Sequence, residues 1–83
     1  MEVKLFQRTQ RDLADSINQV IDKYWEDSIS EHEMVVMIKK LHVNNEKKLI
    51  KDGRYTTVIR QQCGKRRLEV VTNVLQSSEH YSI

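Results

Sequence analysis

Residues 9–25, TQRDLADSINQVIDKYW, give the clearest structural signal in the chain and predict a helix. Apolar side chains recur there at the 3.6-residue spacing and share one stripe, while the opposite face is polar. The stripe comprises Leu13, Ile17, Val20, Ile21, Tyr24 and Trp25. Thr9 is positioned to cap the free amides of the first turn. A helix with a single apolar stripe needs partners that cover it, so the later segments must supply them.

Length and composition indicate one all-α domain. The chain has 83 residues, no Pro and only two Gly, which disfavours a sheet-rich fold with many tight turns. We expect a small bundle of four to five short helices with an extended N-terminal arm. In this interpretation the single helical domain spans 1–83, with the arm at 1–8 and a loose tail at 77–83.

Two further helices are predicted between residues 30 and 53. Ser30 and Glu33 have the spacing of a capping box and predict a helix over roughly 31–43. Asn45 is a candidate cap for a short helix over 46–51. Asp52 and Gly53 then end that helix, since Gly accepts the left-handed conformation that follows a helix.

The segment 54–77 carries two apolar stripes that do not join along one straight helix. A continuous helix would place Arg66 or Arg67 on the buried side, so we expect a break near Gly64 that makes two helices. One long helix whose Arg side chains extend to water is the alternative. The expected core comprises Leu13, Ile17, Ile21, Trp25, Ile38, Leu41, Ile59, Val70 and Val74.

Charge is distributed unevenly along the sequence. Residues 1–38 carry four Lys and Arg against eight Asp and Glu, whereas residues 39–83 carry ten against four. This asymmetry predicts an anionic partner for the second half. The alternative is that the two halves complement each other within one small fold.

Three features that the sequence lacks predict the cellular location of the protein. The single Cys excludes an internal disulfide, the first residues have no signal-peptide pattern, and no stretch approaches the roughly 20 apolar residues of a membrane helix. We therefore expect a cytoplasmic protein that does not contact a membrane.

No constellation of residues predicts catalysis, a cofactor or a metal site. The three His residues and Cys63 show no paired ligand spacing. Cys63 lies next to Gly64 and Lys65 and could form a thiolate, but its spacing from Ile59 favours a small core residue. The pairs Asp12/Asp15 and Glu31/Glu33 fall on polar faces, where solvated carboxylates are expected. We predict no enzyme, no cofactor and no metal.

The basic run Lys65–Arg67 is the sharpest local feature. It follows Gly64, where a new helix would offer free amides and suit an anion. Residues 56–75 also fit part of a helix-turn-helix pattern, although Arg60 and Lys65 replace the small and apolar residues expected there. The predicted contact surface comprises Arg60, Gln61, Lys65, Arg66 and Arg67.

Two segments, LFQRTQRDLADSINQVIDKYW (5–25) and VIRQQCGKRRLEVV (58–71), resemble a family of short helical proteins of Bacillus-like Gram-positive bacteria and their phages. The resemblance runs from about residue 3 to about residue 75. It implies an all-helical protein that is cytoplasmic or phage-encoded, and it transfers no catalytic or binding residues.

Two functional hypotheses remain from the sequence. The first is a small non-enzymatic regulatory protein that docks on a protein partner, with a phage setting favouring a modulator or inhibitor of a host or defence factor. The alternative is a nucleic-acid-binding protein that uses the basic second half. The sequence leaves the oligomeric state open.

Overall fold

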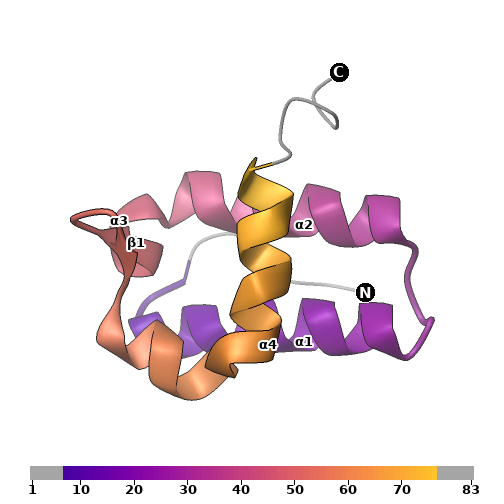
Figure 1. Ribbon diagram of the computed structural model, residues 1–83, viewed down its shortest axis with the longest axis horizontal. Helices are drawn as coiled ribbons and strands as arrows, with labels where there is room; N and C mark the ends of the chain where they lie inside the picture. The colour runs from indigo at the N-terminus through magenta and orange to yellow at the C-terminus, as the bar shows by residue number, and fades with distance from the viewer. Residues whose placement is uncertain (1–6, 77–83) are drawn as a thin grey trace.

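The computed structural model describes residues 7–76, which form an all-α bundle of four helices with one small hairpin. Helices α1 (Gln10–Trp25) and α2 (Glu31–Asn44) lie side by side and run in opposite directions (Figure 1). The short helix α3 (Glu46–Leu49) leads into strands β1 (Ile50–Lys51) and β2 (Arg54–Tyr55). The last helix, α4 (Thr57–Gln76), packs chiefly against α1. The expected tail 77–83 and residues 1–6 of the expected arm lie outside the described residues.

Two of the three predicted N-terminal caps are present, at Thr9 and Ser30. The Thr9 hydroxyl accepts a hydrogen bond from the Asp12 amide at 3.0 Å. At the start of α2, Ser30 and Glu33 bond each other's amides at 3.1 Å, which completes the capping box. These bonds satisfy amides that the two helices cannot pair internally. At α2, the hydrogen bond from the Ser30 amide is the main cause that lowers the pKa of the Glu33 carboxyl.

A residue in the left-handed conformation follows the end of helix α1. Asp27 has φ +62°, and the Ser28 amide donates to the Lys23 carbonyl at 2.8 Å. This is the pattern of a Schellman motif, and it turns the chain back toward α2. The sharp reversal is what makes α1 and α2 antiparallel neighbours.

The segment around Asp52 and Gly53 differs from the prediction of a helix end. Ile50 pairs with Tyr55 and Lys51 with Arg54 in an antiparallel hairpin. Asp52 and Gly53 both have positive φ, as a type I′ turn requires. The predicted helix 46–51 therefore stops at Leu49, and the helix expected from residue 54 begins at Thr57.

The Asn45 side chain does not cap α3 as predicted, and it has a different role. Its side-chain oxygen accepts a hydrogen bond from the Gln7 amide at 3.0 Å, and its nitrogen donates to the Leu41 carbonyl. Asn45 is buried, and it fixes the start of the described chain against the end of α2.

The core lies between α1, α2 and α4. Seven of the nine predicted core residues are buried, and the two exceptions are Trp25, which is exposed, and Val70, which is partly buried. The buried seven are Leu13, Ile17, Ile21, Ile38, Leu41, Ile59 and Val74. The other buried apolar residues of the same core are Ala14, Val20, Met34, Val35, Leu49, Cys63, Leu68 and Val71.

Candidate functional site

The surface most suited to binding is built by a break within α4. Gly64 has φ +79° and ψ +167°, a backbone conformation that only Gly adopts readily. The break divides α4 into a first segment, 57–63, and a second segment, 65–76. Figure 1 shows the second segment turning to cross in front of α1 and α2. The prediction of two helical segments is therefore confirmed.

Two side chains, one from α1 and one from α4 itself, donate hydrogen bonds to backbone carbonyls beside the break. The Asn18 side-chain nitrogen donates to the Gln62 carbonyl at 3.0 Å, and Arg67 Nη1 donates to the Cys63 carbonyl at 3.3 Å. Unpaired backbone groups in the interior are costly, so these bonds help to hold the break in place. The second segment is thus set at a defined angle to the first.

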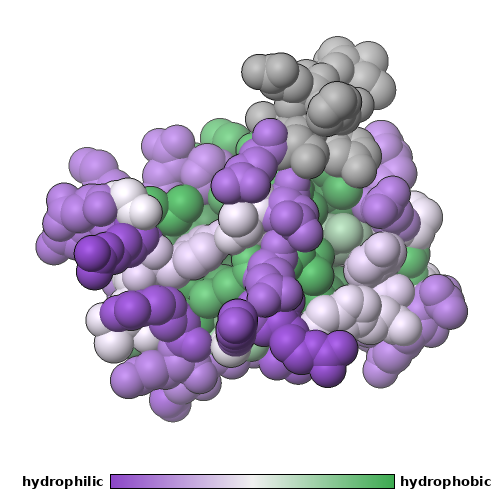
Figure 2. All heavy atoms as spheres, in the orientation of Figure 1, coloured by the Kyte–Doolittle hydropathy of each residue, from purple (hydrophilic) through white to green (hydrophobic). Residues whose placement is uncertain are grey.

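The second segment presents a polar ridge to solvent. Lys65, Glu69 and Asn73 recur every four residues and are all exposed, and Arg66 lies beside them. Figure 2 shows this hydrophilic band between two regions where apolar atoms reach the surface. Those regions correspond to two grooves, one on each side of the ridge, and Asn73 lines both.

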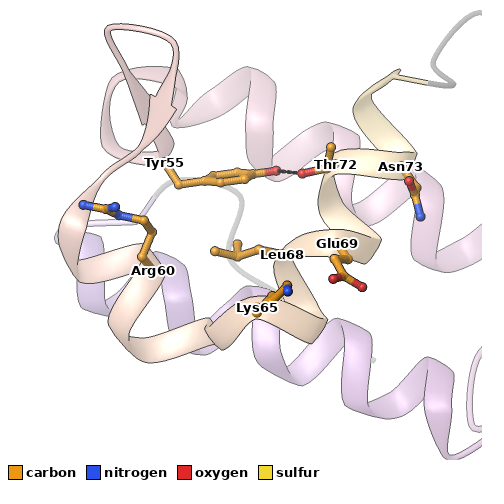
Figure 3. A pocket seen from close by; sticks show the side chains of 7 residues that line it. All are labelled: Tyr55, Arg60, Lys65, Leu68, Glu69, Thr72 and Asn73. Atoms are coloured by element: carbon orange, nitrogen blue, oxygen red, sulfur yellow. Dashed lines mark hydrogen bonds between the residues drawn. The ribbon is translucent and has the colours of Figure 1, made fainter.

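The larger groove, here called the Tyr55 groove, lies between the hairpin and the ridge and has a volume of about 600 Å³. Its lining comprises Tyr55, Arg60, Lys65, Leu68, Glu69, Thr72 and Asn73 (Figure 3). The Tyr55 hydroxyl and the Thr72 hydroxyl lie 2.7 Å apart and share a hydrogen bond. Burial is the main cause that raises the pKa of Tyr55 above its ordinary value, so the ring is a neutral wall of the groove.

The smaller groove, here called the Trp25 groove, lies where the end of α1 meets α2 and α4 and has a volume of about 270 Å³. Its lining comprises Tyr24, Trp25, Glu31, Met34, Val35, Val70, Asn73 and Val74. Most of these side chains are apolar or aromatic, which is the usual composition of a recognition groove.

The prediction that Trp25 is buried is wrong. The side chain is 45% exposed at the edge of the Trp25 groove, because α1 ends at this residue and the described parts of α2 and α4 cover it only partly. The guanidinium carbons of Arg66 and Arg67 lie 5.8 Å and 5.9 Å from its ring centroid. Both distances suit a cation–π interaction, which favours one orientation of the exposed ring.

The structure separates the five residues of the predicted contact surface. Arg60 and Lys65 line the Tyr55 groove, and Arg66 stands beside Trp25 on the other side of the ridge. Gln61 is exposed but lines neither groove. Arg67 forms a two-point ion pair with Asp22 on α1, with both N–O distances at 3.0 Å. Its charge is therefore partly neutralised, and its main role is to join α4 to α1.

The reactive interpretation of Cys63 finds no support. The thiol is buried, and its Sγ lies 3.8 Å from the Ala14 carbonyl, to which it donates. Burial, the largest cause, raises the pKa of Cys63 to about 11, although nearby Arg67 acts in the opposite direction. The thiol is consequently protonated at neutral pH, as the prediction of a core residue requires.

The predicted carboxylate pairs are exposed, with Glu33 occupied in the capping box. Among residues 7–76, no group of three or more His, Cys, Asp or Glu side chains could hold a metal ion. No helix within that range is long and apolar enough to cross a membrane.

Sequence reasoning missed both grooves. The prediction of a helix from residue 54 includes Tyr55, although the Asp-Gly pair at 52–53 between Lys51 and Arg54 is typical of a hairpin. Thr72 carried no signal, because its role depends on a hydrogen bond to a residue 17 positions away. Trp25 was identified by type but assigned to the core.

Comparison with known proteins places the chain in a family. No curated protein and no solved structure matches it. The model of a family described as "Conserved hypothetical protein" matches residues 4–76, which is most of the chain and includes every residue of both grooves. The chain belongs to this family of conserved hypothetical proteins.

Proposed function

We propose that this chain is a small non-enzymatic regulatory protein that docks on a protein partner through the second segment of α4 and the two grooves beside it. The single observation that carries the proposal is the exposed Trp25 ring, flanked by the guanidinium groups of Arg66 and Arg67. The ring does not stand alone on the surface, because it borders the largely apolar lining of the Trp25 groove, and exposed apolar patches mark interaction sites.

The chemistry of this cluster suits a protein interface. Trp and Arg are among the residues that most often dominate binding energy, and they act from the centre of an apolar patch. The Trp25 groove supplies apolar surface through the partly exposed Val70, and the buried Met34 and Val74 also line it. Because cation–π contacts already orient the ring, little side-chain freedom remains to be lost on binding.

The proposed regulatory role is supported by the size of the chain, by its family resemblance and by its expected location. A chain of 83 residues with no acid–base constellation in its sequence suits a protein that acts by occupying a surface of another. The resemblance to short phage-associated proteins favours a modulator or inhibitor of a host or defence factor. The unpaired Cys63 favours the cytoplasm as its location.

Affinity capture from a cell lysate, with and without nuclease, tests the proposal. The tagged chain should retain a protein at defined stoichiometry after nuclease treatment. Loss of all captured protein on nuclease treatment would contradict protein docking and indicate a nucleic-acid bridge.

Nucleic-acid binding is the second candidate, and the break at Gly64 favours it. Two helical segments joined at a Gly, the second carrying exposed Lys65, Arg66 and Asn73, resemble a recognition helix. Two features rank it second. The break spans one residue rather than a three- or four-residue turn, and Glu69 lies on the ridge where it would repel phosphate.

A salt titration against random duplex DNA distinguishes this candidate. If Arg60, Lys65 and Arg66 contact phosphates, the log–log plot of affinity against salt should have a slope of about −3. Changing all three to Gln should flatten it. Absence of binding to duplex and single-stranded DNA at low salt would exclude the candidate, because even non-specific binders show affinity there.

A further inference from the structure

We infer that the Tyr55 groove receives an acidic segment of the protein partner, with a large apolar side chain against Leu68 and carboxylates on Arg60 and Lys65. The inference rests on the proposed function and specifies the chemistry of the partner. The Trp25 groove, on the other side of the ridge, would then contact a different part of the same partner.

Two uncompensated cations give the groove its charge. Arg60 and Lys65 are both exposed, and within residues 7–76 neither side chain makes a hydrogen bond or an ion pair. In Figure 3 Arg60 lies at the end of the groove next to the hairpin, Lys65 lies near the middle beside Glu69, and Asn73 lies at the opposite end. A ligand with two separated anionic groups, one near the hairpin and one near the middle of the groove, would gain a charge-assisted contact from each cation.

The middle of the groove is apolar and held in place. Leu68 belongs to the core, is 8% exposed, and lines the groove. The Tyr55 ring stands opposite, anchored through its hydroxyl by the bond to Thr72 (Figure 3). A Leu or Phe side chain placed between them would lose its water without disturbing any polar group of the groove.

The surrounding charge selects an acidic partner over a basic one. Lys51 and Arg54 on the adjacent hairpin are exposed and extend the positive field, against the single carboxylate of Asp52 in its turn. Glu69 disfavours a continuous polyphosphate backbone along the groove, whereas a peptide can present an amide or a Lys side chain to it. These observations favour an acidic peptide segment over a nucleic acid.

The probe is a defined peptide, acetyl-Glu-Glu-Leu-Asp-Phe-Glu-Glu-amide, titrated into the ¹⁵N-labelled full chain and followed by amide NMR shifts. The expected shifts are confined to the Tyr55 groove, at Tyr55, Leu68 and Thr72. Arg60→Gln and Lys65→Gln should each weaken binding about tenfold, since each removes one charge-assisted contact. Lys40→Gln is the matched control. It removes the same charge from an exposed residue outside both grooves and should leave the affinity unchanged.

Three results of the peptide titration would overturn the inference. The first is no shift at millimolar peptide. The second is equal weakening by Lys40→Gln, which would indicate non-specific charge attraction. The third is tighter binding of an oligonucleotide at the same amides. A captured partner whose affinity is insensitive to Arg60→Gln and Lys65→Gln would also refute this inference, yet it would leave protein docking intact, so the two failures are distinguishable.

Discussion

Arg67 on α4 holds Asp22 on α1 through two parallel hydrogen bonds, Nε to Oδ1 and Nη2 to Oδ2, each 3.0 Å long. The pair joins residues 45 positions apart and lies directly beside the break at Gly64. The same guanidinium donates to the Cys63 carbonyl and approaches the Trp25 ring. Arg67 thereby positions the second segment of α4, and with it both grooves, against α1.

A double-mutant cycle on this pair should reveal a real coupling energy. Asp22→Asn and Arg67→Gln, singly and together, should give about 1 kcal/mol by urea unfolding, because two-point Arg–carboxylate contacts exceed simple surface pairs. Lys23 and Glu26 form the control pair, 3.9 Å apart and more exposed, with an expected coupling of about 0.3 kcal/mol. Equal coupling for the two pairs would show that Arg67 is an ordinary surface residue.

Gly64→Ala should destabilise the protein by about 1–3 kcal/mol. A Cβ there would meet no atom within 4 Å, so the cost arises from the backbone conformation alone. Gly53→Ala, at φ +78° and equally open, is the control and should cost about 1 kcal/mol. Chemical denaturation measures both. A neutral Gly64→Ala variant would mean that α4 is free to straighten.

Cys63 should stay unreactive toward a thiol reagent at neutral pH until the protein unfolds. Its folded pKa is raised from the ordinary 9.0 to about 11. Its contribution to stability is therefore fully present below the ordinary value and is lost as pH rises through the folded value. Cys63→Ala should cost about 1 kcal/mol at neutral pH and reduce the loss of stability in that alkaline range. Rapid labelling of the native protein would contradict a buried thiol.

Ile17→Asp should prevent stable folding. Ile17 is 1% exposed at the centre of α1, and an unpaired charge there removes several kcal/mol from a small domain of limited stability. Gln19→Asp adds the same charge to the exposed face of the same helix and should change stability by no more than about 0.5 kcal/mol. Circular dichroism melts compare the two. Similar melting temperatures would refute the assignment of the core.

Local patterns in the sequence predicted most of the fold. The apolar stripe of α1, the capping box at Ser30 and the break at Gly64 each depend on residues within one or two turns of one another. Such features are set by helical periodicity and backbone sterics, which sequence spacing records directly. The hairpin at Asp52 and Gly53 was also marked locally, but the same pair ends helices, and no apolar alternation distinguished the two.

The candidate site was less predictable because it depends on contacts between distant segments. The apolar stripe of α1 predicts the face of the helix on which Trp25 lies. It does not predict whether α2 and α4 extend far enough to cover the side chain. The partner of Arg67 lies on another helix, so the sequence showed a free cation where the structure has an ion pair. The sequence shows the basic run Lys65–Arg67 directly. The two grooves, which lie on either side of the second segment of α4, depend on how that segment crosses α1 and α2.

The central claim is that the chain docks on a protein partner through the surface around Trp25. The most direct test measures how fast the captured partner dissociates from the Trp25→Ala variant and from the Val43→Ala variant. Val43 is the other large apolar side chain exposed within residues 7–76, at 68%, and it lines neither groove, so it controls for loss of exposed apolar surface. Both variants must first have melting temperatures close to that of the wild type. The captured partner is treated with nuclease before the measurement. We expect Trp25→Ala to dissociate at least about tenfold faster and Val43→Ala to match the wild type. Equal rates for Trp25→Ala and the wild type would contradict docking through this surface.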